Sequence, residues 1–145
     1  MRNRGSSTLV QELAQALSSA ERCVLRQVAR ALADEGVSVE EWRTMQLLAD
    51  GRGHRMSEIS EFAFVPAPSL TRLIDRMVTD GLVHRRVDET DRRRVLVHLT
   101  PRGRALQRRL AARVEREQPA MLAGDDPADA QQLLGLLSSL VTRLR

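Results

Sequence analysis

Residues 71–100 read TRLIDRMVTDGLVHRRVDETDRRRVLVHLT, and this stretch decides the fold. It predicts a helix that ends at Asp80, then a strand over 82–87, a charged loop over 88–93 and a second strand over 94–99. Two short strands joined by a polar tip are typical of a β-hairpin. Because the tip carries consecutive arginines, it suits an anionic groove better than a protein core. The stretch therefore predicts a winged helix that binds DNA.

A second helix is predicted just before this one, so that the two form a helix-turn-helix. The sequence favours helices over about 56–63 and 67–80, joined by a short turn. A proline is tolerated in the first turn of a helix, which fits the Pro-Ala-Pro-Ser stretch that opens the second one. Arg72 and Arg76 lie one turn apart on that helix, on a different face from its apolar residues.

Long amphipathic helices are expected on both sides of this unit. One spans about 8–34 after a polar, frayed start, and the other region spans about 101–145, with a break or kink near Pro119. A capping box at Ser38 begins a helix over 39–49, so the DNA-binding lobe covers about 38–100. The flanking helices carry more apolar residues than an isolated helix can bury. We expect them to form a homodimer interface; the alternative is that they pack on each other within one chain.

Positive charge is concentrated in one part of the chain. All 23 basic residues are arginine and the net charge is +4. Residues 66–110 contain eleven arginines and five acidic residues, so this segment alone exceeds the charge of the whole chain. A concentrated basic patch is typical of nucleic-acid binding. A solvated charged surface is the alternative, and a GC-rich genome is a sufficient reason for the arginine bias.

Several classes of protein are disfavoured by what the sequence lacks. A single cysteine, Cys23, excludes an internal disulfide and fits the reducing cytoplasm. No apolar run approaches the roughly 20 residues that span a membrane, and no signal peptide begins the chain. Motifs for phosphate, zinc or catalysis are missing, so we expect no enzyme, cofactor or metal. His84 and His98 could face each other across the wing and bind a metal, although a surface pair is the simpler interpretation.

The chain resembles the MarR (multiple antibiotic resistance regulator) family of bacterial winged-helix transcription factors. The most specific matches are TRLIDRMVTDGLVHRR at 71–86 and DRRRVLVHLTPRGRAL at 91–106, and the resemblance covers essentially the whole chain. It implies a single domain over 1–145, mainly α with a small β wing and with N- and C-terminal dimerisation helices. It also implies a homodimeric repressor that binds a palindromic operator in double-stranded DNA and is released by a small effector, often a phenolic or aromatic acid.

The resemblance assigns roles to residues of the lobe. It implies that the major groove is contacted by Ser69, Thr71, Arg72 and Arg76. Arg93 would reach the minor groove, and Asp91 would orient that arginine. The flanking phosphates would be contacted by Arg85, Arg86 and Arg94. Asp75 is acidic on the DNA-facing helix, so we expect it to pair with a nearby arginine. The sequence departs from the family at Phe64, where glycine is common, and at Pro66 and Pro68. These departures put the entry angle of the helix in doubt.

An effector cleft implied by the resemblance could be lined by Arg22, Arg26, Trp42, Arg43 and His54. An arginine would attract a carboxylate and Trp42 would offer a stacking face. The simpler interpretations are core packing for Trp42, a solvated loop position for His54 and dimer-surface charges for Arg22 and Arg26. None of the five is assigned individually.

Two further functions remain as alternatives. Some relatives sense peroxides through a cysteine on the first helix, activated by tyrosine hydroxyls. This chain has no tyrosine, and a buried helical cysteine is usually inert, so redox sensing by Cys23 is disfavoured. A nonspecific architectural DNA-binding protein would differ from a regulator in its low preference for any one sequence.

Overall fold

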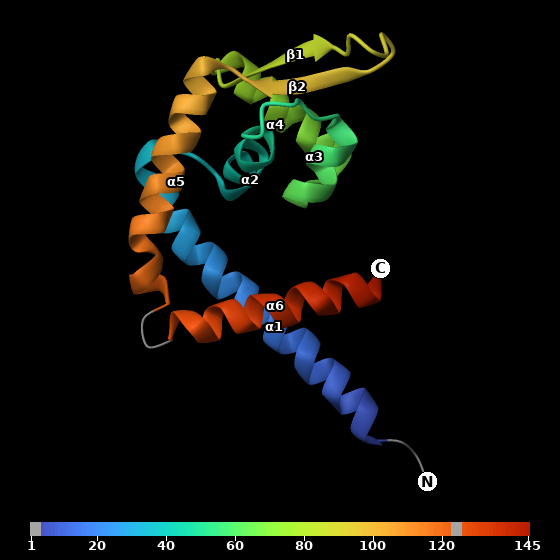
Figure 1. The fold of residues 1–145 in the computed structure, drawn as a ribbon, viewed down its shortest axis with the longest axis vertical. Helices are drawn as coiled ribbons and strands as arrows, with labels where there is room; N and C mark the ends of the chain where they lie inside the picture. The colour runs from blue at the N-terminus through green and yellow to red at the C-terminus, as the bar shows by residue number, and fades with distance from the viewer. Residues whose placement is uncertain (1–3, 123–125) are drawn as a thin grey trace.

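The computed structural model describes residues 4–122 and 126–145, and it has the predicted mainly helical fold with a small β wing (Figure 1). The elements in chain order are α1 (Arg4–Leu32), η1 (Ala33–Glu35), α2 (Val39–Leu48), α3 (Met56–Ala63), α4 (Ala67–Thr79), β1 (Val83–Val87), β2 (Val95–Leu99), α5 (Pro101–Met121) and α6 (Pro127–Leu144). α2, α3, α4 and the wing form one lobe, from which α1 and α5 extend (Figure 1).

The start of α1 and the end of α5 can be compared with the boundaries expected from the sequence. The start of the chain is not frayed as far as expected, because α1 already begins at Arg4; residues 1–3 lie outside the described residues. Once a helix is nucleated, each added residue gains a hydrogen bond, so a long helix extends into polar flanking residues. α5 continues through Pro119 but ends at Met121, two residues later, which fits the expected break near this proline.

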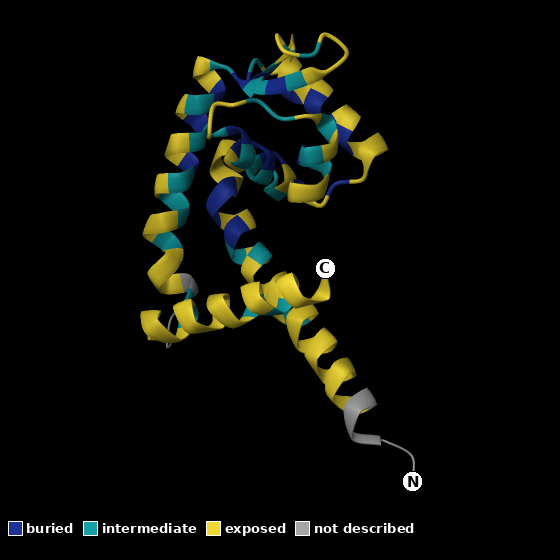
Figure 2. Ribbon diagram, turned by 45° about the vertical axis from the view of Figure 1, so that its right-hand side comes forward, coloured by how far each residue is buried: buried dark blue, intermediate teal, exposed yellow. Residues whose placement is uncertain are grey.

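The hydrophobic core lies inside the lobe and holds α4 in place. Leu70, Ile74 and Met77 form the predicted apolar face of α4 and are fully buried. They pack in one cluster with Leu32 at the end of α1 and Leu110 of α5. Figure 2 shows this buried region in the lobe, whereas the outer parts of α1 and α6 are exposed. The core therefore fixes which face of α4 is presented to solvent.

The wing is a two-stranded antiparallel sheet extended by one isolated bridge. β1 and β2 pair with His84 opposite His98, and each strand begins one residue later than expected. His54, in the loop between α2 and α3, forms two backbone hydrogen bonds with Val97 of β2, at 3.1 and 2.9 Å. The wing is thereby attached to the helix-turn-helix on one edge.

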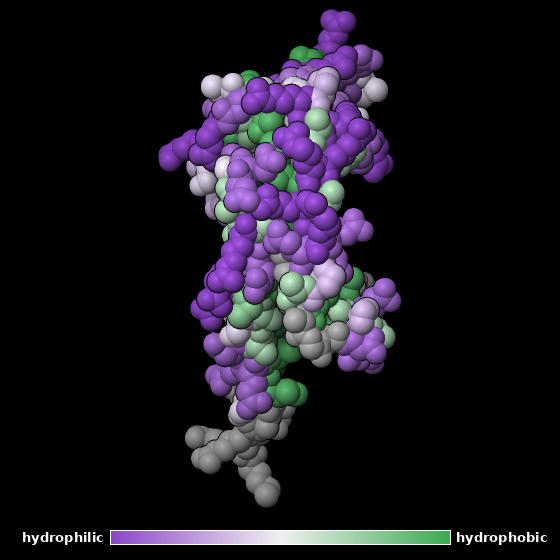
Figure 3. Space-filling model, turned by 90° about the vertical axis from the view of Figure 1, so that its left-hand side faces the viewer, coloured by the Kyte–Doolittle hydropathy of each residue, from purple (hydrophilic) through white to green (hydrophobic). Residues whose placement is uncertain are grey.

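α1 and α6 leave a large apolar surface uncovered. The exposed apolar side chains are Leu9, Val10, Leu13, Leu17 and Val24 on α1, and Leu133, Leu134, Leu136, Val141 and Leu144 on α6. The ribbons of α1 and α6 cross in both views, yet these side chains remain exposed (Figures 1 and 2). Hydrophobic side chains also gather on the lower half of the molecule in Figure 3, below a mostly hydrophilic lobe. Packing within one chain is therefore insufficient to cover this surface.

Gly103 at the start of α5 leaves no room for a side chain. A Cβ at this position would overlap the carbonyl oxygen of Leu82. That oxygen is fixed, because it accepts hydrogen bonds from the backbone N–H of Thr100 at 3.0 Å and from its hydroxyl at 3.2 Å. We expect Gly103→Ala to lower the free energy of unfolding by about 2 kcal/mol, the cost of overpacking. Thermal unfolding followed by circular dichroism measures this, and Arg102→Ala in the same turn, where the side chain is exposed, should show no comparable loss.

Candidate nucleic-acid interface

α4 presents a polar face opposite its buried one. Ser69, Thr71, Arg72 and Arg76, all predicted to contact DNA, are exposed on this helix. The Thr71 hydroxyl donates a hydrogen bond to the carbonyl of Ala67 at 3.2 Å, one turn earlier. Arg72 has no ion pair among the residues that the structure describes. Its guanidinium is therefore available to an external acceptor.

Arg76 connects α4 to the start of α2. Its Nε lies 3.5 Å from the Oε1 of Glu41, which is 8% exposed. The Glu41 carboxylate also accepts the backbone N–H of Ser38 at 2.8 Å, completing the predicted capping box. Arg76 thus helps to orient α4 on the lobe. Sequence reasoning identified the capping box but missed this contact of Glu41.

The base of the wing is tied to α4 by an ion pair. Arg85 of β1 donates to the Oδ1 of Asp75 at 2.5 Å, which confirms the expectation that Asp75 pairs with a nearby arginine. Arg86 lies 3.5 Å from Glu89, and both side chains are exposed. An exposed pair of this kind contributes little stability and exchanges readily for a phosphate.

The tip of the wing is shaped by two aspartates. Asp88 accepts the backbone N–H and the hydroxyl of Thr90, and these bonds lower the pKa of its carboxyl group. Asp91 accepts the backbone N–H of Arg93 at 3.1 Å.

Asp91 thus holds Arg93 through the backbone and not through its side chain. The carboxylate instead pairs with the Nε of Arg94 at 3.1 Å, because the turn brings residue 94 back over it. Arg92 and Arg93 are exposed, and within 4–122 and 126–145 neither has an ion pair. The tip therefore carries two free guanidinium groups.

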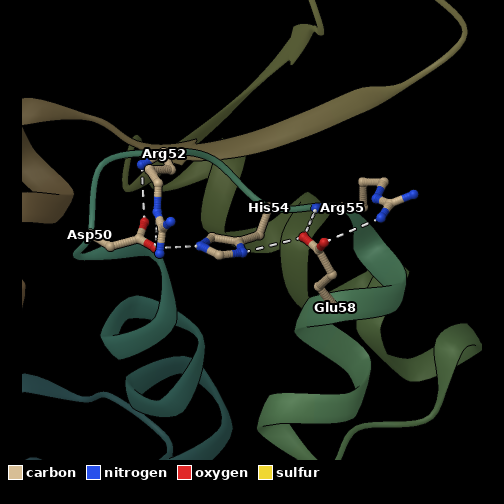
Figure 4. A network of polar contacts seen from close by, with 5 residues as sticks. All are labelled: Asp50, Arg52, His54, Arg55 and Glu58. Carbon is tan, nitrogen blue, oxygen red and sulfur yellow. Dashed lines mark hydrogen bonds and ion pairs between the residues drawn. The ribbon is translucent and has the colours of Figure 1, made fainter. Parts of the chain in front are cut away.

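His54 is not the solvated loop residue that the sequence suggested, because it joins the α2–α3 loop to α3 (Figure 4). Its side chain is 16% exposed, with Nε2 at 2.8 Å from Asp50 and Nδ1 at 3.2 Å from Glu58. Arg52 also pairs with Asp50, and Arg55 with Glu58. Burial is tolerated because both ring nitrogens have carboxylate partners.

The two carboxyl groups of this network, Asp50 and Glu58, have lowered pKa values. Burial alone would raise the pKa of Asp50, but hydrogen bonds from the backbone of Arg52 and from His54 offset it, and the net pKa is lowered. The backbone N–H of Arg55 is the main reason that the pKa of Glu58 is lowered. At neutral pH both carboxylates are therefore ionised and pair with the arginines of the network.

His84 and His98 stack across the wing, as their register predicted. Their ring centroids are 5.5 Å apart and the ring planes differ by 13°. Gly53 packs so closely that a Cβ there would overlap the His98 ring. No group of three or more His, Cys, Asp or Glu side chains that could hold a metal occurs among the described residues.

Acidification is expected to destabilise the wing through His98. Burial, followed by the charges of His84, Arg86 and His54, lowers the pKa of His98. At a pH just below 6.5, His98 is therefore protonated in the unfolded chain but still neutral in the folded chain. The free energy of unfolding consequently falls as the pH drops through 6.5 toward the lower pKa of the folded state. We expect the free energy of unfolding to fall by about 1 kcal/mol or less between pH 7 and 5.5, which lowers Tm by a few degrees. His98→Gln should reduce this fall; an equal fall in both proteins would contradict the role of His98.

The five expected effector residues fall in two clefts. Arg22 and Arg26 line one of about 740 Å³ with Cys23, which is exposed and accepts a hydrogen bond from Arg26 at 3.4 Å. Trp42, Arg43 and His54 line another of about 750 Å³, called here the Trp42 cleft. The structure thus separates two sets that the sequence had grouped together.

The Trp42 cleft has aromatic walls and one largely buried cation. Trp42 packs against the core, as its simpler interpretation predicted, yet its indole N–H is buried without a partner in the described part of the chain. The Arg43 side chain is 19% exposed, and Glu21 is 3.8 Å away. Its guanidinium lies over the Phe64 ring, 5.3 Å from the centroid.

No helix among the described residues has the length and hydropathy needed to span a membrane.

Comparisons with known proteins agree with this geometry. A model of the MarR family matches residues 35–94. The homoprotocatechuate degradative operon repressor of Escherichia coli is 30% identical over 102 residues, which cover 70% of this chain and 69% of that protein. A MarR family regulator from Silicibacter pomeroyi has a TM-score of 0.73 at 28% identity, covering 90% of each chain. The repressor CouR, solved with a 23-mer DNA duplex, has a TM-score of 0.76 at 25% identity and covers 100% of this chain and 99% of that one.

Proposed function

Because the chain belongs to the MarR family, whose members are transcriptional regulators and not enzymes, we propose that it is a homodimeric repressor of a palindromic operator. The observation that carries this proposal is a set of arginines with no ion-pair partner among the described residues, on the exposed face of α4 and at the wing tip: Arg72, Arg92 and Arg93. Free guanidinium groups on a helix and on a hairpin suit adjacent grooves of one duplex.

The contacts divide into those that position the protein and those that select the sequence. Phosphate contacts fix register, whereas base-edge contacts confer specificity. We assign the major-groove edge to Ser69, Thr71, Arg72 and Arg76, and the minor groove to Arg93. The phosphates fall to Arg85, Arg86 and Arg94, whose aspartate or glutamate partners in the free protein are exposed or half-buried and exchange for phosphate.

The homodimer follows from the uncovered apolar surface of α1 and α6. A contiguous exposed apolar surface on a folded chain marks an interaction site. A two-fold axis through these helices would present two copies of α4, which matches the symmetry of a palindromic site.

An aromatic carboxylate is the effector that the Trp42 cleft fits best. Arg43 is largely buried and its ion pair with Glu21 is long, so a second anion would compensate its desolvation. Trp42 offers a stacking face and His54 polar nitrogens. The relative from Escherichia coli is named for the degradation of homoprotocatechuate, itself an aromatic carboxylate.

A second candidate is regulation through Cys23. The thiol is exposed and therefore accessible to an oxidant, and the guanidinium of Arg26 lies 3.4 Å from its sulfur. If peroxide releases the wild-type protein from DNA but not Cys23→Ser, this candidate replaces the effector cleft.

Selection of bound duplexes from a random pool tests the proposed function. We expect a palindrome with half-sites about one helical turn apart, bound at least a thousandfold more tightly than scrambled DNA at physiological salt. Equal affinity for all duplexes would point to an architectural protein and would overturn the proposal.

A further inference from the structure

Phe64, in the turn between α3 and α4, combines two unfavourable features. Its backbone is left-handed, with φ 56° and ψ 41°, and among the described residues it is the one non-glycine position with positive φ. Its side chain is also 78% exposed. An L-residue in this conformation costs roughly 1–2 kcal/mol, which glycine would avoid. A large aromatic residue at this position therefore indicates a functional contact made by its ring.

That contact is Arg43 of α2, whose guanidinium lies over the ring. Phe64 also lines two hollows. One is the Trp42 cleft. The other is a groove that Phe64 lines together with Pro66, Ser69 and Arg72 at the start of α4. Phe64 is thus shared between the cleft and the DNA-binding helix.

We propose that Phe64 is a positioning residue for DNA binding, held by Arg43, and that it transmits occupancy of the Trp42 cleft to α4. The ring fixes the turn from which α4 begins, only two residues before Pro66. A carboxylate in the cleft forms charge-assisted hydrogen bonds with Arg43 that are stronger than a cation–π contact. It therefore draws the guanidinium away from the ring and releases the strained turn. This second step rests on the effector cleft proposed above.

The first experiment needs no effector and uses a duplex selected from the random pool. Phe64→Tyr keeps the aromatic face, whereas Phe64→Leu removes it, and both retain a side chain at positive φ. We expect Phe64→Leu to bind the duplex about fivefold more weakly, equivalent to about 1 kcal/mol, and Phe64→Tyr to bind within about twofold of wild type. Arg43→Gln should cause a similar loss, and the double variant Arg43→Gln/Phe64→Leu no larger one.

A purely structural role would lower the thermal stability of Phe64→Leu and would not produce this non-additivity. Thermal unfolding of the Tyr and Leu variants should therefore agree within a few degrees. Wild-type affinity in Phe64→Leu, or losses that add in the double variant, would overturn the positioning role.

The second experiment tests the coupling with benzoate as the probe. Trp42 is the chain's single tryptophan, so its fluorescence reports binding in the cleft directly. Benzoate should weaken duplex binding by the wild-type protein and by Phe64→Tyr, the control that keeps the aromatic face. Phe64→Leu should still bind benzoate, with duplex affinity changing less than about twofold.

The two proposals fail in distinguishable ways. If benzoate weakens duplex binding by Phe64→Leu as strongly as by wild type, transmission through Phe64 is overturned. If the wild-type protein does not bind benzoate, the aromatic-acid effector fails and transmission from the cleft fails with it. The affinities measured without benzoate still decide whether Phe64 positions α4.

Discussion

Leu133→Glu/Leu136→Glu on α6 should yield a monomer that binds the operator about a thousandfold more weakly than wild type. Both side chains are exposed in the single chain, so their replacement leaves the core of the lobe unchanged. In a dimer they would be covered, and burying unpaired carboxylates costs several kcal/mol. A monomer also loses the second α4 and wing, and with them the roughly 10²–10⁴-fold gain of bivalent binding. Sedimentation velocity measures the state of assembly, and fluorescence anisotropy the affinity.

Gln131→Glu/Gln132→Glu is the matched control for this prediction. It adds the same two negative charges to the same helix at exposed polar positions. It should remain dimeric and bind the operator nearly as well as wild type. A double leucine variant that still sediments as a dimer would show that the two-fold interface lies elsewhere.

Local signals in the sequence were sufficient to predict most of the fold. The capping box at Ser38 and the apolar period of α4 predicted those helices within one or two residues. The hairpin register that places His84 against His98 follows from the alternation of the two strands. Each of these features depends on neighbours within one element or one turn, so it can be derived from the chain itself.

The parts of the site that sequence analysis missed are contacts between distant segments. His54 follows closely after two glycines, which predicts a solvated loop position, yet its bridge to Val97, more than forty residues later, buries it. Its carboxylate partners stand four residues before and after it, a spacing that indicates contact on a helix but not in a loop. The contacts of Arg43 with Phe64 and of Arg76 with Glu41 likewise depend on how helices pack.

The charge distribution could be predicted, but not which arginines are free. The sequence shows eleven arginines between 66 and 110 without distinguishing them. The structure ties Arg76, Arg85 and Arg94 to acidic partners and leaves Arg72 and Arg93 without one among the residues described. Paired arginines must exchange a protein partner for a phosphate, so their net contribution to DNA binding is smaller. The unpaired ones should dominate the salt dependence.

Arg93→Ala should therefore reduce the slope of log affinity against log salt by about one unit for each subunit. A dimer loses two contacts, which at about 0.1 M salt weakens operator binding by roughly fiftyfold through lost counterion release. The backbone of Arg93 is held by Asp91, so its guanidinium needs little ordering to reach the minor groove. Anisotropy titrations between about 0.05 and 0.3 M salt give the slope directly.

Arg116→Ala provides the comparison for Arg93, because it removes the same charge from an exposed position on the part of α5 that extends from the lobe (Figure 1). Net charge alone would change both slopes equally, whereas contact with DNA at the wing tip changes only that of Arg93→Ala. An unchanged slope in Arg93→Ala would mean that the wing tip does not touch the duplex. Sequence recognition would then rest on α4 alone, with Arg72 as its one unpaired guanidinium among the predicted contacts on that helix.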